Sequence, residues 1–445
     1  MLEEREIRRV LETALRHSAA DQTEASLFVQ DSALTRFANN YVHQNVAERD
    51  TTVLVRAVFG KKIGVASVNS TDEAAIRSAV ERASDLARHQ IDNPDFRSLP
   101  GPGPVKEARA YVAATAECTP EQRARAVDVI CSRAKDQGLV TAGTFSTGVS
   151  QFAIANSLGV FAHHADTLAE CTAVVMSDTS SGYADRRSLD VRAIDPEAIA
   201  TEAVDKARRG RDPETLETGE YEVLLEEYAV SDLLDFLAYL GFSALAVQEG
   251  HSFMAGRFGQ PIVGSNISIW DDGLGEGTVP TPFDFEGVPK QRVDLITDGV
   301  ANAVCYDSYT AGKEGKESTG HALPAGETFG PVPLNLYLRP GDASKEDLLR
   351  GIRRGIWVTR FWYTRVVHPL TVTVTGMTRD GTFLIENGEI TRPVKNFRFT
   401  QSYLEALRHV ERIGRDLSLQ RTMFPSNLVP ALHIGRWNFT GVTEY

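Results

Sequence analysis

The spacing of apolar residues predicts a helix followed by several strands at the start of the chain. Five large apolar residues recur at helical spacing within residues 1–17 and would form one face of a helix: Leu2, Ile7, Val10, Leu11 and Leu15. Runs rich in β-branched and aromatic residues follow, which predicts strands at 25–31, 34–38, 52–60 and 61–68. A second helix is expected to begin near Thr71, whose side chain can cap it, and to continue to about residue 87.

A proline-rich segment then interrupts this pattern. Residues 93–104 contain four prolines in twelve positions. Proline fixes φ and lacks a backbone donor, so this composition predicts an extended linker rather than a helix or a strand. The linker, assigned to residues 93–107, would end an α+β unit that spans residues 1–92.

The order of helix, strands and helix recurs after the linker, over residues 108–217. A helix is expected from Thr119, strands at 139–146, 151–157 and 169–177, and a final helix from Asp195 to about Arg209. The tripeptides Phe37-Ala-Asn and Ile154-Ala-Asn occupy equivalent places, 117 residues apart (154 − 37). This recurrence predicts an internal duplication, although an α+β pattern can also recur without a common origin.

The remaining residues, 218–445, differ from both units. A strand at 221–225 precedes a helix at 230–241, and short strands are then expected at 262–270, 333–338, 368–377 and 382–386. One more helix is predicted from residue 400 to about 416. The pattern therefore predicts an α+β protein in which two N-terminal units precede a large domain dominated by antiparallel sheet.

Composition and charge narrow the class of protein. The chain has 445 residues, ordinary hydrophobic content and a formal net charge of −13, which disfavours broad binding to nucleic acid. We expect no membrane association, since no apolar run is long enough to span a bilayer. The charged residues that follow Met1 do not resemble a signal peptide, so a cytoplasmic location is expected.

No two of the four cysteines have CxxC spacing, and buried, reduced thiols are predicted.

Common catalytic motifs are absent from the sequence. It contains no HExxH, no GxSxG and no GxxxxGK[ST]. The ten histidines are scattered, and none has the spacing of a zinc-ligand pair on a helix. Residue types and spacing alone therefore identify no active site.

Six segments nevertheless resemble, in the same order, the motifs of the TldD/PmbA family of metallopeptidases. They are Gly219–Leu234, Ser252–Gln260, Ile267–Gly273, Phe283–Pro289, Glu317–Ala322 and Ile385–Val394. Each match is short, but their order is specific, and the two preceding α+β units are similar to those of the family. The resemblance covers nearly the whole chain. It implies the fold of this family, which has also been labelled a modulator of DNA gyrase, although this acidic sequence offers no support for DNA contact.

The resemblance also implies which kind of subunit this is. TldD-type subunits bind zinc through HExxxH on a helix and a distal cysteine, whereas TldE (PmbA) subunits lack these ligands and pair with TldD. The first histidine of the motif lies 21 residues before a glycine that corresponds to Gly256, at position 235 (256 − 21). Here Asp235, Phe236 and Leu240 replace the family's ligands, and residues 421–426 contain no cysteine.

The function implied by this resemblance is that of a TldE-like, non-catalytic subunit of a zinc metalloprotease complex. It would hold no cofactor itself, with zinc expected only in a TldD-type partner, and would help to process an unfolded or leader peptide. A heterodimer with that partner is implied, and a homodimer stays open. Four residues are candidates for a substrate cleft: His251, His321, Asp271 and Asp272.

Two other functions remain open from the sequence. The chain could be a stand-alone hydrolase with an unrecognised site, which would draw on those four residues together with Glu249 and His368. It could also be a homodimeric peptide-binding protein without catalysis.

Overall fold

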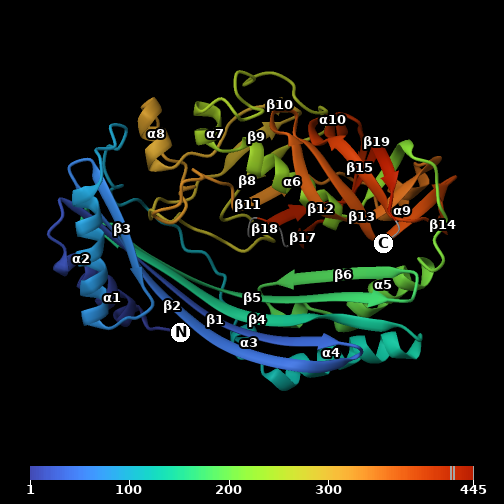
Figure 1. The fold of residues 1–445 in the computed structure, drawn as a ribbon, viewed down its shortest axis with the longest axis horizontal. Coiled ribbons are helices and arrows are strands. Elements are labelled where there is room, and N and C mark those ends of the chain that lie inside the picture. The colour runs from blue at the N-terminus through green and yellow to red at the C-terminus, as the bar shows by residue number, and fades with distance from the viewer. Residues whose placement is uncertain (421–422, 424–425, 444–445) are drawn as a thin grey trace.

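The computed structural model describes residues 1–420, 423 and 426–443. Its first half forms one curved, six-stranded antiparallel sheet in the order β3-β2-β1-β4-β5-β6 (Figure 1). The strands are β1 (Gln22–Ala38), β2 (Tyr41–Phe59), β3 (Lys62–Val68), β4 (Val140–Asn156), β5 (Phe161–Met176) and β6 (Ser181–Ser188). The sheet joins both predicted α+β units, since β1 of the first pairs with β4 of the second.

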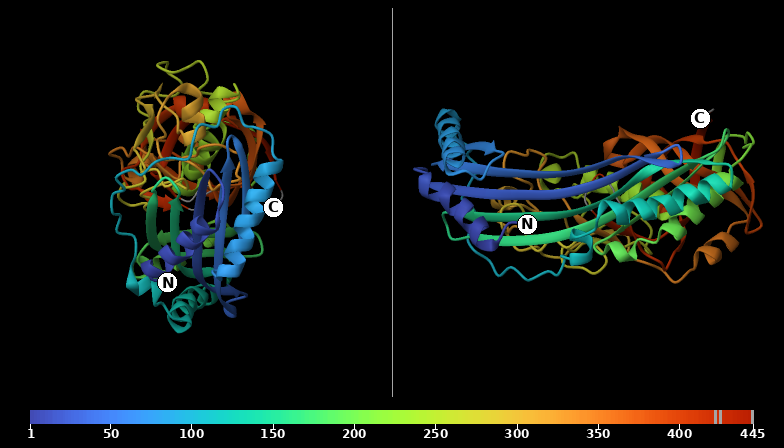
Figure 2. Two further views of the ribbon diagram at one scale, coloured as in Figure 1. Left: turned by 90° about the vertical axis from the view of Figure 1, so that its left-hand side faces the viewer. Right: turned by 90° about the horizontal axis from the view of Figure 1, so that it is seen from below.

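Helices cover one face of this sheet, as Figure 2 shows from below. They are α1 (Glu4–His17), α2 (Glu73–His89), the short α3 (Ala113–Ala116), α4 (Pro120–Asp136) and α5 (Pro196–Arg209). Ala25 and Leu27 of β1 pack against α1 and α2, whereas Phe37, further along the same face of this strand, packs against α4 and α5. Side chains alternate across a strand, so the opposite face is left for the C-terminal domain.

The two halves of the sheet repeat one arrangement of helix, three strands and helix. Gly64 of β3 lies so close to α2 that an added Cβ would be 2.2 Å from the Ala83 carbonyl oxygen. Gly182 of β6 has the same relation to α5, where a Cβ would be 2.1 Å from the Ala203 carbonyl oxygen. Both glycines allow a helix to approach the sheet closely. This matched packing, 118 residues apart (182 − 64), supports the duplication.

The strands of this sheet are longer than their predicted counterparts. The predicted strands 25–31 and 34–38 are one strand, β1, and 139–146 and 151–157 are likewise one strand, β4. β2 begins at Tyr41, and β6 was not predicted at all. The first half of β2 is mostly exposed, so its polar sequence resembles a loop, and only its pairing with β1 reveals the strand.

The proline-rich linker is extended but partly packed. Phe96 and Leu99 are buried against Val58, and the Leu99 amide donates to Gln22 Oε1 over 2.8 Å. Residues 101–104, in contrast, are exposed and form no regular structure. The buried anchors therefore hold the first half of the linker, while its second half lies open to solvent.

Limited proteolysis is expected to cut the native protein first within residues 92–107, as its composition predicts, and specifically at 101–107. Exposed backbone without regular hydrogen bonding enters a protease site most easily. Trypsin can cut after the exposed Lys106, and mass spectrometry of the first two fragments measures the position. The variant Lys106→Gln should delay this cut. An earlier cut inside 219–400 would contradict the prediction.

The C-terminal domain contains two sheets with α6 (Glu227–Gly241) between them. The strands of one sheet lie in the order β12-β7-β19-β15-β13-β14. Because β12 also pairs with β13, the first five strands of this order form a closed circuit of pairings within this sheet. Its strands are β7 (Gly219–Leu225), β12 (Arg354–His368), β13 (Thr373–Glu386), β14 (Glu389–Pro393), β15 (Phe397–Ser402), β16 (Val410–Ile413) and β19 (Leu432–Val442). Eleven of the fifteen residues of α6 are buried, and they form one core with residues of both sheets.

The second sheet of this domain has the order β10-β9-β8-β11-β18-β17. Its strands are β8 (Ile269–Asp271), β9 (Val293–Thr297), β10 (Val300–Ala301), β11 (Asn335–Leu338), β17 (Ser418–Gln420) and β18 (Ser426–Val429). Short helices complete the domain: α7 (Ala244–Gln248), α8 (Ser308–Glu314), α9 (Lys345–Arg350) and α10 (Tyr403–Arg408). Most pairings in both sheets are antiparallel, which confirms the predicted α+β class.

Two predicted elements of this domain are shorter than expected, and the strand predicted at 368–377 instead spans the end of β12, the turn Pro369–Thr371 and the start of β13. The helix expected over 400–416 is only the six residues of α10, because residues before it pair with β13 and Val410–Ile413 pair with β19. The strand predicted at 262–270 shrinks to β8. In both places long-range strand pairing decides the structure over local preference.

The C-terminal domain lies on the helix-free face of the N-terminal sheet (Figure 1). Arg56 of β2 joins the two, since its guanidinium donates to Glu24 of β1 at 2.6 Å and to Glu286 of the C-terminal domain at 3.2 Å. Beside this ion pair, Phe28 and Phe152 of the sheet stack with Phe283 and Phe285. The interface is therefore specific, apolar and charge-paired. No helix in the described part of the chain is long and apolar enough to cross a membrane.

Candidate functional site

The three positions that the family resemblance assigns to the zinc motif lie on α6, where their side chains are buried. Asp235 is buried and accepts hydrogen bonds from the Met423 amide at 3.0 Å and from Asn427 Nδ2 at 3.2 Å. Phe236 packs edge-on against the ring of Tyr403, 6.0 Å between centres, and Leu240 belongs to the same core. Neither the phenyl ring of Phe236 nor the aliphatic chain of Leu240 offers a zinc ligand.

The segment that would carry the distal cysteine lies mostly outside the described residues. Of residues 421–425, only Met423 is described, and the sequence there contains no cysteine. Within the part of the chain that the structure describes, no group of three or more His, Cys, Asp or Glu side chains is placed to hold a metal ion.

Two of the predicted cleft residues, Asp271 and His321, meet inside the domain instead. His321 Nε2 lies 2.8 Å from Asp271 Oδ1, and both side chains are fully buried. Lys290, also fully buried, completes the cluster with its Nζ 3.4 Å from the same oxygen. The other carboxylate oxygen accepts from the Asn335 amide at 2.7 Å. The structure places this cluster in the core of the domain, where all three side chains are shielded from solvent.

Electrostatics fix the protonation of the cluster. Burial acts to raise the pKa of Asp271, but Lys290 and His321 outweigh it and hold this pKa below the usual range. Burial and the Lys290 charge lower the pKa of His321, which is therefore neutral at physiological pH. A carboxylate only accepts, so His321 Nε2 carries the proton and Nδ1 is left to accept from Thr319 Oγ1, 2.9 Å away.

Other motif residues form the turns around this cluster. Buried Asp284 accepts backbone hydrogen bonds from Glu286, Val288 and Ala322, each at 2.9 Å. It thereby ties the Phe283–Pro289 turn to the Glu317–Ala322 loop. Burial, together with the Glu286 charge, raises the pKa of Asp284 to about 7. Three segments that carry the family resemblance thus meet in one buried polar cluster: Ile267–Gly273, Phe283–Pro289 and Glu317–Ala322. The hydrogen bonds of this cluster connect the loops that contain them.

The side chains of the remaining candidates take no part in this cluster. His251 is exposed and lies 3.5 Å from Glu249, Asp272 caps the loop by accepting from the Leu274 amide, and His368 Nδ1 contacts Thr371 Oγ1 at 3.1 Å. The residues considered for a stand-alone hydrolase therefore do not gather at one site. Sequence reasoning missed Lys290, for which the only signal was its place directly after the Phe283–Pro289 motif.

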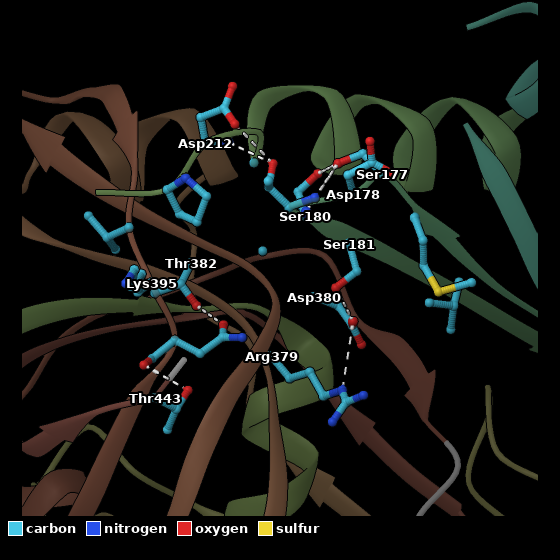
Figure 3. A pocket seen from close by; sticks show the side chains of 18 residues that line it. Ser177, Asp178, Ser180, Ser181, Asp212, Arg379, Asp380, Thr382, Lys395 and Thr443 are labelled. Atoms are coloured by element: carbon cyan, nitrogen blue, oxygen red, sulfur yellow. Dashed lines mark hydrogen bonds and ion pairs between the residues drawn. The ribbon is translucent and has the colours of Figure 1, made fainter. Parts of the chain in front are cut away.

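A pocket of about 600 Å³ lies where the N-terminal sheet meets the C-terminal domain (Figure 3). The β5–β6 turn forms one wall and β13 the other. Ser181 of β6 donates to Asp380 of β13 at 2.6 Å, and Arg360 pairs with the same carboxylate. The described residues that line the pocket carry hydroxyl, carboxylate and cationic groups but include no histidine or cysteine. The pocket therefore lacks the usual base of a nucleophilic site. The sequence contained no signal for this pocket.

Models of one protein family match most of the chain. The PmbA/TldA metallopeptidase C-terminal domain matches residues 218–441, the central domain of that family matches 108–211, and its domain 1 matches 24–87. The matches lie in the order in which the family arranges its three domains.

Curated relatives and a solved structure agree with these models. Metalloprotease PmbA of Escherichia coli O157:H7 is 25% identical over 387 residues, which cover 83% of this chain and 82% of that protein. The metalloprotease TldD homolog of Haemophilus influenzae is 24% identical over 82% of this chain and 79% of its own. The crystal structure of TldE from Thermococcus kodakarensis superposes with a TM-score of 0.90 at 20% identity, covering 98% of this chain and all of that one, which shows the same fold. By its three matched domains, the chain belongs to the PmbA/TldD metallopeptidase family.

Proposed function

We propose that this chain is a TldE-like, non-catalytic subunit of a TldD/TldE-type zinc metalloprotease complex that acts in the cytoplasm on unfolded or leader peptides. The observation that carries the proposal is the composition of α6. Phe236 and Leu240 occupy two positions of the zinc motif and are packed in the core, so this helix can neither bind zinc nor activate water. Catalysis would then depend on zinc in a TldD-type partner.

The N-terminal sheet supports the proposed contact with a peptide. It ends at β3 on one side and β6 on the other. The β6 edge faces the C-terminal domain, where the Asp185 amide donates to Tyr228 Oη at 3.2 Å, so the β3 edge is the one that the proposal uses; among the described strands it has no second strand partner. An extended peptide can add to such an edge through backbone hydrogen bonds that tolerate many side chains. That mode suits an unfolded or leader peptide, whose sequence varies along its length.

The expected result is that the chain alone neither holds stoichiometric zinc nor cleaves peptides, and that it supports cleavage once mixed with a TldD-type chain. Elemental analysis after dialysis measures zinc, and hydrolysis of an unfolded protein such as casein measures activity for each chain alone and for the mixture. The mixture treated with a chelator is the control.

Three outcomes would contradict the proposal, each in its own way. Hydrolysis by the pure chain, unaffected by chelator, would favour a stand-alone hydrolase. Tight binding of about one zinc per chain would show a metal site that α6 does not explain. Failure to associate with a TldD-type chain, with peptide binding retained, would favour a homodimeric peptide-binding protein.

A further inference from the structure

An unusual concentration of exposed apolar side chains lies on the second half of β12 and the turn after it. Seventeen large apolar residues are exposed among those that the structure describes, and five of them fall within residues 362–370: Trp362, Tyr363, Val366, Val367 and Leu370. The side chains of Tyr363 and Val367 are 65% and 56% exposed. We refer to residues 362–370 as the β12 arm.

The arm departs from the usual pattern of a strand on a solvated surface. The first half of β12, up to Phe361, is mostly buried in the core of the domain. Beyond it, only Thr364 is buried, and apolar residues occupy both faces of the strand. A strand with one face in water normally alternates apolar and polar side chains, and large exposed apolar patches mark interaction sites. The arm therefore has the character of an interface that lacks its partner.

Local backbone geometry displays these side chains. Tyr363 has φ of +56°, and the pairing of β12 with β13 shifts register between Trp362 and Arg365. Val372, just after the arm, has φ of +46°. Left-handed geometry is costly for residues other than glycine, most of all for a β-branched one. The fold thus holds the arm in a defined, irregular shape, which suits a specific contact.

Arg365 on the arm and Arg379 on the neighbouring β13 give this surface a positive charge in an otherwise acidic chain. The Arg365 guanidinium lies 4.2 Å from the centre of the Tyr363 ring, and that of Arg379 lies 4.7 Å from Trp362. In the described part of the chain no carboxylate is within ion-pair distance of Arg365. Arg379 reaches only Asp380, at 3.9 Å, and that carboxylate already pairs with Arg360. Both cations are thus available to carboxylates from outside.

The charge of the arm argues against a second copy of this chain as its occupant. In a two-fold homodimer the arm would contact the same arm of the other copy. Arg365 and Arg379 of both copies would then lie in one interface, and like charges gathered in an interface weaken it. The better match is a different chain that presents apolar side chains flanked by carboxylates.

We propose that the β12 arm is the docking surface for the TldD-type subunit, which would contribute an apolar and acidic patch. This inference rests on the proposed function, because that function supplies the partner. Tyr363, Val366 and Val367 would make the apolar contacts, and Arg365 and Arg379 would pair with the partner's carboxylates. Exposed aromatic and arginine side chains are the residue types that carry most binding energy at interfaces.

The test is the affinity of the full-length chain for the TldD-type chain, measured by isothermal titration calorimetry. The triple variant Tyr363→Ser, Val366→Ser, Val367→Ser is expected to weaken binding by about 100-fold, and Arg365→Glu by about 10-fold. These side chains are exposed, so the variants should fold, which circular dichroism and melting temperature check. The control variant Phe258→Ser removes an exposed aromatic residue elsewhere on the domain, 42% exposed, and should bind like the wild type.

Several results would overturn the inference. If the wild type binds the TldD-type chain and both arm variants bind equally well, the docking surface lies elsewhere while the proposed function stands. If the wild type does not bind the TldD-type chain at all, the proposed function is wrong. The assignment of that chain to the β12 arm is then wrong as well. Variants that only dissociate a homodimer would assign the arm to a second copy, and variants that lose peptide cleavage within an intact complex would assign it to the peptide.

Discussion

Replacing Asp271 with alanine is expected to destabilise the C-terminal domain by about 3–5 kcal/mol, the usual cost of breaking a buried ion pair from one side. The carboxylate accepts from His321 Nε2, Lys290 Nζ and the Asn335 amide, and it is fully buried. Its removal would leave the Lys290 ammonium in the core without a counter-charge. Urea unfolding followed by tryptophan fluorescence measures the change, since Trp270 is adjacent in β8.

Two further variants test the reason for this loss. Asp272→Ala removes the neighbouring carboxylate, which is half-buried and, among the described residues, accepts from the Leu274 amide alone. This change should cost about 1 kcal/mol. Adding Lys290→Met to Asp271→Ala removes the unpaired charge and should recover part of the stability. A single Asp271→Ala variant as stable as the wild type would show that the cluster does not hold the loops together.

The second large effect concerns α6. Converting Asp235→His, Phe236→Glu and Leu240→His rebuilds HExxxH, and we expect an unstable protein with weak zinc binding and no peptidase activity. Phe236 and Leu240 are core residues, and each polar replacement left unpaired there costs about 1–3 kcal/mol. No cysteine lies within 421–426 to add a ligand. Groups that orient metal-bound histidines would also be absent, which typically lowers affinity or activity by about 10–100-fold.

Thermal unfolding, zinc titration and casein hydrolysis measure the three parts of this prediction. Tyr239→His provides a matched control, because Tyr239 lies on the same helix but is 41% exposed, and its replacement should change stability little. A stable triple variant that binds zinc tightly and cleaves peptides would show that the remainder of a catalytic site is present. That result would argue against a partner subunit.

The family and the fold class were accessible from the sequence because both depend on local signals. Turn residues and glycines at fixed offsets make the six motifs recognisable, and several such glycines, for example Gly256 and Gly287, have positive φ. Helices such as α4 and α5 carry their own start signals, since Thr119 and Asp195 cap them directly before a proline. The sequence also led to the prediction that α6 lacks zinc ligands, because a helix keeps such a motif within one short segment.

The sequence could not show which residues form hydrogen bonds and ion pairs with each buried polar side chain. Asp271 and His321 have the residue types of a cleft and were predicted there, but Lys290 and the Asn335 amide complete a buried set around them. A charged residue in the core is stable only when its partners are present. Those partners come from segments up to 64 residues away, so no local pattern indicates them.

The amino-acid sequence was enough to predict the α+β class and the family, because these follow from short-range periodicity, turn chemistry and residue identity. The tertiary structure decided that the two N-terminal units share one sheet through the pairing of β1 with β4. It also decided that two of the cleft candidates, Asp271 and His321, lie in the core and that the β12 arm stays exposed. These outcomes depend on long-range strand pairing and on which face another element covers, and both are set only when the whole chain packs.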